Sequence, residues 1–307
     1  MRGALRFACV AAPIVLAGCE LKEITIVDVE DVVIAEIYVN LAGDPTENEI
    51  IAFLHRTVGT ARTGLVPDAR ITVRRADGLT LNLVTNQLGD CIGSFPLGGS
   101  GACFLADPAQ TQSLRPGDFL EVEVTLMDGG TLFGAVRVPS PFQILAVSPT
   151  CRLDPNTLMP VRWVRSEGAW AYVNETLIRG LPEALEPEGI VVEADPLYLL
   201  GLSISVKDTT IVFPSEFGVF NRFELDQDVA VRLQSGLPPS TTAEVAITAV
   251  ERNYVNWARG GNFNPSGRVR VPSLRGDGTG VFAATVNRRF VVFSSEPGGS
   301  LPDCPVS

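Results

Sequence analysis

Short runs rich in Val, Ile, Leu, Phe and Thr recur along almost the whole chain, and turn sequences rich in Gly, Pro and Asp separate them. In the run from Leu120 to Thr125, apolar and polar residues alternate strictly, as they do in a strand that buries one face. Regularly spaced short strands with turn signals between them are typical of β-sandwiches and β-barrels. The pattern therefore predicts an all-β protein.

A Pro-marked stretch, Pro139-Ser140-Pro141 followed by Ser148-Pro149, divides the predicted strands into two groups. We expect residues 24–148 to form an N-terminal immunoglobulin-like β-sandwich and residues 149–307 to form a second β-sandwich or partly open β-barrel. The strands expected in the first domain are 24–29, 32–40, 49–57, 69–75, 79–85, 102–106, 119–127 and 131–138. Those expected in the second are 159–164, 170–176, 190–194, 204–206, 209–213, 223–225, 230–233, 243–250, 281–286 and 289–293, with short helices at 182–185 and 253–259.

The N-terminus resembles an export signal. Arg2 and Arg6 flank the start of an apolar run, from Phe7 to Leu16, which has the length of a signal-peptide core and is too short to span a bilayer. The run ends in Leu16-Ala17-Gly18-Cys19, which is similar to the lipobox that lipoprotein signal peptidase cleaves. We therefore expect residues 1–18 to be a lipoprotein signal peptide and Cys19 to be the lipidated first residue of a tether over 19–23. The alternative is an ordinary secretory signal with a chance cysteine at the cut.

The lipid is the expected membrane attachment, because no later run approaches the roughly 20 apolar residues that a membrane helix needs. Lipoproteins of this kind carry two or three acyl chains, which hold a protein firmly. Glu20, Lys22 and Glu23 give the tether a net negative charge, and an acidic tether resembles those of some outer-membrane lipoproteins that are exported to the cell surface. We expect a lipid-anchored protein of the cell envelope, in the outer membrane and with its body on the outer face.

The balance of charge bears on the partner. The chain carries a formal net charge of −11, and it becomes more acidic when Arg2 and Arg6 leave with the signal peptide. Such a chain lacks the basic patch that nucleic acid requires, so nucleic acid is excluded as a partner. An acidic surface also argues against a body that lies flat on anionic lipid.

The cysteines indicate an oxidising compartment. Cys9 leaves with the signal peptide and Cys19 takes the lipid, which leaves an even set that allows three pairings: Cys91, Cys103, Cys151 and Cys304. We predict a bond between Cys91 and Cys103, which closes a Gly-rich loop, and one between Cys151 and Cys304, which ties the chain end to the start of the second domain. In the chain-entropy model these bonds contribute roughly 3 and roughly 5 kcal/mol. A zinc site is the competing use, but the chain has no paired CxxC and one histidine, so we expect no metal.

No catalytic residue and no cofactor are predicted. His55 is the sole imidazole and stands on an apparent strand, where a half-buried structural histidine is the favoured interpretation over a general base. The segment Gly276 to Gly280 lacks the Lys-Ser/Thr of a phosphate loop and precedes a strand, so we expect a tight connection. Arg275-Gly276-Asp277 spells the integrin-binding tripeptide, for which chance is the favoured explanation. Asp44, Glu47 and Glu49 do not have EF-hand spacing.

Aromatic side chains are the better candidates for binding. We expect Trp170 and Tyr172 to be core residues, because they share one strand face. Trp257 and Tyr254 stand beside a polar loop that contains Asn262 and Asn264, a combination suited to stacking on a sugar or anchoring a protein. A packed connection is the equal alternative for Trp257.

Several segments taken together resemble a known family. They are the lipobox, the strand 32–39, the Pro-Asp-Ala-Arg-Ile-Thr-Val segment at 67–73, the Leu-Arg-Pro-Gly segment at 114–117 leading into 119–125, and the segment 273–282. Their order is similar to that of a family of uncharacterised two-domain β-rich outer-membrane lipoproteins, a domain of unknown function whose members are often encoded near TonB-dependent transporters. The resemblance implies fold and location and transfers no catalytic residue. We expect a non-enzymatic binding or accessory protein for an envelope partner, such as an outer-membrane transporter or its substrate. The alternative is a carbohydrate-binding or weakly hydrolytic surface protein.

Overall fold

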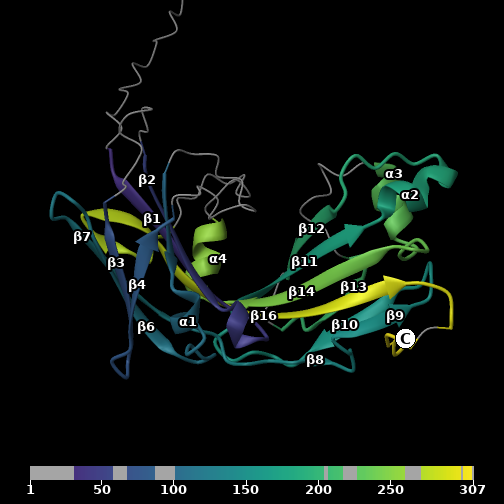
Figure 1. Ribbon diagram of the computed structural model, residues 1–307, viewed down its shortest axis with the longest axis horizontal. Coiled ribbons are helices and arrows are strands. Elements are labelled where there is room, and N and C mark those ends of the chain that lie inside the picture. The colour runs from purple at the N-terminus through teal and green to yellow at the C-terminus, as the bar shows by residue number, and fades with distance from the viewer. Residues whose placement is uncertain are drawn as a thin grey trace, which may run out of the picture.

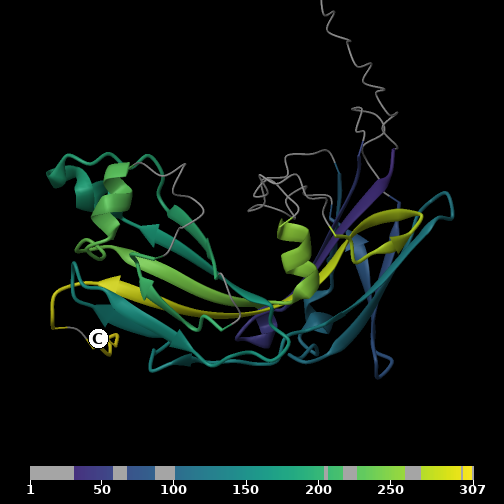
Figure 2. The ribbon, with the colours of Figure 1, turned by 180° about the vertical axis from the view of Figure 1, so that it is seen from behind.

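In a computed structural model of the chain, the described residues are 31–57, 68–86, 101–203, 207–216, 227–259, 271–298 and 300–305. They form one 13-stranded mixed sheet and one 3-stranded sheet. Figures 1 and 2 show two lobes, with the large sheet curving continuously from one lobe into the other. The all-β, sandwich-like fold predicted from the sequence is confirmed.

The first lobe is built from antiparallel strands in the order β1, β2, β5, β4, β3, β6, β7. Every second side chain along these strands points into the core, as in β6, where Leu120, Val122 and Val124 are buried. The predicted boundaries of these strands hold to within one or two residues. The elements are β1 (Val33–Leu41), η1 (Pro45–Glu47), β2 (Glu49–Arg56), β3 (Arg70–Arg75), β4 (Thr80–Thr85), β5 (Ala102–Ala106), α1 (Pro108–Thr111), β6 (Phe119–Thr125) and β7 (Thr131–Arg137).

The second lobe continues the large sheet through β14, β11 and β12 and adds the small sheet of β13, β10 and β8. Its largest fully buried side chains include Tyr172 and Phe213. After β7, the elements along the chain are β8 (Ile144–Leu145), β9 (Thr150–Leu153), β10 (Met159–Trp163), β11 (Ala171–Arg179), α2 (Leu181–Leu185), η2 (Glu186–Glu188), β12 (Leu197–Leu202), β13 (Thr210–Phe213), α3 (Gln227–Leu233), β14 (Thr242–Val250), α4 (Arg252–Arg259), β15 (Arg275–Gly276) and β16 (Gly278–Ser294).

Strand β16 joins the lobes. Its first half pairs in parallel with β1, and its second half pairs in antiparallel with β14 and in parallel with β9. The short strand β15 pairs with β7. The chain leaves the first lobe near the predicted division at residue 148, but β15 and the first half of β16 return to that lobe and complete its sheet.

The two strands predicted at 281–286 and 289–293 are in fact the single strand β16, so the predicted break at Asn287-Arg288 is wrong. The guanidinium of Arg288 does not turn toward solvent. It donates to the carbonyl oxygens of Ala42 (3.2 Å) and Phe142 (3.0 Å) and lies 5.8 Å from the centre of the Phe142 ring. These contacts satisfy the charged group at the junction of the lobes, and partial burial lowers the pKa of Arg288.

Two other predicted strands in the second lobe are corrected. Residues 230–233 belong to helix α3, in which Val229 and Leu233 are buried at helical spacing. Residues 190–194 are irregular. The helices predicted at 182–185 and 253–259 are confirmed as α2 and α4. The predicted strands 24–29, 204–206 and 223–225 lie outside the described residues.

The Gly-rich segment between β15 and β16 is a tight connection, as predicted. Gly276 and Gly280 have φ of +132° and +144°, and a Cβ at Gly280 would collide with the carbonyl oxygen of Ala35. Asp277 donates its backbone N–H to the Thr131 carbonyl and accepts the Thr131 N–H on its carboxylate, both at 2.8 Å. The Arg-Gly-Asp triplet is therefore fixed to the edge of β7.

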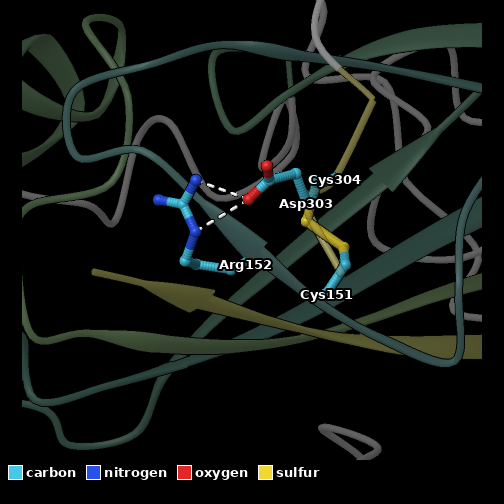
Figure 3. The surroundings of a disulfide bond; sticks show 4 residues. All are labelled: Cys151, Arg152, Asp303 and Cys304. Atoms are coloured by element: carbon cyan, nitrogen blue, oxygen red, sulfur yellow. Dashed lines mark hydrogen bonds and ion pairs between the residues drawn. A yellow bond between two sulfur atoms is a disulfide. The ribbon is translucent and has the colours of Figure 1, made fainter. Parts of the chain in front are cut away.

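The predicted disulfide between Cys151 and Cys304 is present, with a Cα–Cα distance of 5.0 Å. Figure 3 shows it beside an ion pair in which Nε of Arg152 donates to a carboxylate oxygen of Asp303 at 2.8 Å. Backbone hydrogen bonds join Arg152 to Pro302 and Cys304. The C-terminal segment is thus fastened to β9. Cys103 is disulfide-bonded, and its predicted partner Cys91 lies outside the described residues, as does Cys19.

Candidate functional site

Helix α4 lies on the curved sheet between the two lobes (Figures 1 and 2). It begins directly after β14, where the carboxylate of Glu251 accepts the backbone N–H groups of Asn253 (2.6 Å) and Tyr254 (2.9 Å). These bonds satisfy two of the donors that a helix start leaves without a partner. Burial of this carboxyl, which is 6% exposed, raises the pKa of Glu251 to about 7 against the opposing effect of backbone hydrogen bonds from Asn253, Tyr254 and Ala284.

The two aromatic residues that the sequence offered as binding groups lie on the sheet-facing side of α4. Trp257 is 7% exposed and packs with Tyr38, Val281 and Ala283. Tyr254 meets Tyr38 edge to face, with ring centres 6.1 Å apart. Trp257 therefore belongs to the packing of the helix and is not presented to solvent. Asn262 and Asn264 lie outside the described residues.

Beneath Trp257 lies a buried acid, Glu36 of β1, which is 2% exposed. Its carboxylate accepts the hydroxyl of Tyr38 at 2.9 Å and the indole N–H of Trp257 at 3.3 Å. Nε2 of His55, on the neighbouring strand β2, lies 3.5 Å from the other carboxylate oxygen. His55 is half-buried on its strand, stacked on Phe53 with ring centres 5.3 Å apart. This cluster positions α4, because a buried carboxylate is costly unless its hydrogen bonds are made.

The opposite side of α4 borders an open groove with a volume of about 740 Å³. Its floor is the outer face of β6 and β7, and its wall is the first turns of α4 together with the segment 271–275. The amide of Asn253 holds the wall to the floor by donating to the carbonyl oxygens of Ala135 (3.3 Å) and Phe282 (3.0 Å). The groove is lined by Arg74, Glu121, Val122, Glu123, Thr131, Leu132, Phe133, Gly134, Ala135, Arg252, Asn253, Asn256, Val271, Pro272, Ser273 and Arg275.

Three arginines converge on this groove from separate segments. Arg74 of β3 pairs with Glu123 of β6 at 2.8 Å. Arg252 of α4 lies over the ring of Trp170, 5.1 Å from its centre. Arg275 of β15 stands directly across from Phe133 of β7. The groove therefore combines guanidinium groups with exposed apolar side chains.

Trp170 was expected in the core but is 49% exposed, whereas Tyr172 is 1% exposed as predicted. Trp170 precedes β11, and its backbone N–H donates to the Val250 carbonyl at 2.8 Å. Its ring lies outside the core and makes a cation–π contact with Arg252. The prediction was wrong because residue 170 is not part of the strand, so strand alternation does not place its side chain.

Sequence reasoning missed the groove. It selected the correct helix, α4, but chose Tyr254 and Trp257, which face the sheet and do not line the groove. One signal was present, since Phe133 stands between the inward positions Leu132 and Gly134 and is the one large apolar side chain on the outward face of its strand. An outward aromatic residue at such a position is a binding candidate in its own right. Among the described residues, no group of three or more His, Cys, Asp or Glu side chains is arranged to hold a metal ion, and no helix is long and apolar enough to cross a membrane.

Comparisons with known proteins identify no relative. No protein family matches the sequence, and no curated protein matches it. Among solved structures, the chain is similar to a DUF4785 family protein from Legionella pneumophila subsp. pneumophila str. Philadelphia 1, at 12% identity and a TM-score of 0.20, over 69% of this chain and 51% of that one. It is also similar to the complex of Dpr11 IG1 with DIP-gamma IG+IG2, at 8% identity and a TM-score of 0.20, over 87% of this chain and 100% of that one. The chain thus spans about half the length of the Legionella protein, and likenesses this weak carry no argument about function.

Proposed function

We propose that this chain is a non-enzymatic lipoprotein of the cell envelope, anchored by lipid on Cys19, that binds another envelope protein. An outer-membrane transporter or a protein that acts with it is the partner we favour. The N-terminal sequence with its lipobox supports the location. The resemblance of the sequence to lipoproteins of unknown function encoded near TonB-dependent transporters supports the choice of partner.

The groove beside α4 is the observation that carries the proposal of binding. It is open to solvent, and it presents Phe133, which is 57% exposed, beside guanidinium groups. Aromatic residues and arginine are enriched among the residues that contribute most to protein interfaces. The groove is also built on strands and a helix, which hold a binding surface more firmly than loops do.

A carbohydrate-binding surface protein is the second candidate. The exposed ring of Trp170 favours it, because sugars stack on aromatic rings. The guanidinium of Arg252 already occupies one face of that ring. A protein partner is therefore the better supported of the two.

Affinity purification of the full-length tagged protein from detergent-solubilised membranes tests the proposal. We expect one envelope protein to be recovered in a constant ratio to this chain, and Phe133→Ser to lower its recovery at least tenfold. Val231→Ser is the matched control, because Val231 is also 57% exposed but lies on α3 in the other lobe. Melting curves of both variants should coincide with that of the wild type.

A wild-type chain that always elutes alone would contradict the proposal. Binding to defined oligosaccharides on a glycan array, without a protein partner, would favour the second candidate.

A further inference from the structure

We infer that the groove beside α4 recognises an extended segment of the partner protein that carries carboxylates next to apolar side chains, with Arg252 and Arg275 binding the carboxylates. This inference rests on the proposed function and gives the chemistry of the partner at that site.

The charge of the groove is opposite to that of the molecule. The whole chain carries 24 basic and 35 acidic residues, whereas the groove lining contains three arginines and two glutamates. Arg74 and Glu123 already neutralise each other at 2.8 Å. Within the described part of the chain, neither Arg252 nor Arg275 has a carboxylate partner. Two exposed guanidinium groups are therefore left for a ligand, against one further carboxylate in the lining, that of Glu121.

The strand register places a cation and an aromatic ring side by side. Directly opposed residues of neighbouring strands point to the same face of a sheet. Glu123, Phe133 and Arg275 are opposed across β6, β7 and β15, so they form one row on the outer face. A ligand lying across β7 thus meets the Phe133 ring with a guanidinium on one side of it. A bound segment with an apolar side chain next to an acidic one could place the first on Phe133 and the second on Arg275.

The apolar part of the lining selects a peptide over a free anion or an acidic sugar. Phe133 and Val271 are 57% and 55% exposed, and a partner that covers both gains the free energy of burying apolar surface. An acidic sugar pairs with the arginines but offers few apolar groups for these two side chains. The planar guanidinium also forms paired hydrogen bonds with a carboxylate, which fixes the orientation of the bound segment.

A random twelve-residue peptide library displayed on phage is the probe for this site, selected on the full-length protein in detergent. We expect the enriched peptides to share an Asp or Glu within two residues of an aromatic or aliphatic residue. A synthetic peptide of the enriched sequence should bind at least tenfold more weakly after its acidic residues are replaced by their amides. Its affinity should fall as salt is raised, because the contacts are ionic.

The double variant Arg252→Gln and Arg275→Gln should bind that peptide at least tenfold more weakly than the wild type does. The control is Arg162→Gln, which changes an exposed arginine on β10 in the other lobe and should leave the affinity for the peptide unchanged. The inference would be overturned if no peptides were enriched or if the enriched peptides lacked carboxylates. It would also be overturned if the wild type, the double variant and the Arg162→Gln control bound the peptide equally well. The proposed function fails separately: if the membrane purification recovers a partner that depends on Phe133 but the peptides lack acidic residues, only the carboxylate assignment is wrong. If no partner is recovered, the proposed function itself is wrong.

Discussion

At the scale of single residues, two buried carboxylates hold one short helix in place. Glu36 supports the underside of α4 through the indole of Trp257, and Glu251 satisfies the backbone donors at its N-terminal end. Both acids are almost completely buried, with Glu36 2% and Glu251 6% exposed. Because Arg252 and Asn253 of this helix line the groove, the two acids also set the shape of the proposed binding site.

The pKa of Glu251 predicts how stability changes with pH. The pKa is about 7 in the folded chain and 4.5 for a glutamate exposed to water, so between these values the folded protein keeps a proton that the unfolded chain has lost. The free energy of unfolding must then fall as pH rises through this window, by about 3 kcal/mol for a difference of this size. Urea unfolding from pH 4.5 to pH 8 should show this decline in the wild type and a flatter profile in Glu251→Gln. Parallel profiles would show that Glu251 is not the cause.

At the scale of elements, the contact between β9 and the C-terminal segment stabilises the second lobe. The bond between Cys151 and Cys304 closes a long loop, with a sequence separation of 153. The neighbouring pair of Arg152 and Asp303 and two backbone hydrogen bonds hold the same segments together. The covalent and non-covalent contacts therefore act on one short stretch.

Removal of this disulfide should destabilise the protein without unfolding it. We expect the double variant Cys151→Ser and Cys304→Ser to lose about 2 to 5 kcal/mol in the free energy of unfolding, because the unfolded chain regains the freedom that the bond restricts. Urea unfolding under non-reducing conditions measures the loss. Asp303→Asn, which removes only the charge of the partly exposed ion pair, should cost about 1 kcal/mol or less. An equal loss in both variants would mean that the covalent bond contributes little.

The sequence predicted some elements well and others not at all, for identifiable reasons. Strand β6 was predictable because its alternation is strict and turn residues bound it. Helix α3 was missed because the apolar residues Val229, Val231 and Leu233 also fit strand spacing in so short a window. The continuity of β16 was hidden by Arg288, whose partners are carbonyls of distant segments.

The groove was not predictable by the same logic, because its arginines come from β3, α4 and β15. No local pattern connects such residues. What the sequence did provide was the helix that forms the wall of the groove and the Gly-rich connection that presents Arg275. The exposed ring of Phe133 was the remaining clue.

At the scale of the whole molecule, the proposed attachment to the membrane rests on Cys19. We expect Cys19→Ala to move the protein from the membrane pellet to the soluble fraction, because the acyl chains supply the proposed anchor. Immunoblots of fractionated cells measure this. Cys9→Ala is the control, since Cys9 leaves with the signal peptide and its loss should change nothing. Globomycin, which blocks the lipoprotein peptidase, should leave the longer precursor uncut. A mutant that still pellets, with normal processing under the drug, would refute lipid anchoring.

The late position of β16 in the sequence affects how the chain folds. Asn40 of β1 and Thr285 of β16 are hydrogen-bonded across a sequence separation of 245. Until the last part of the chain has been synthesised, β1 lacks its partner on that side and presents an open strand edge. Such edges readily pair with other chains, and contacts between distant segments form slowly. The first lobe is therefore at risk of aggregation until β16 is in place, and a chain cut short before residue 278 should aggregate and become a substrate for chaperones and proteases.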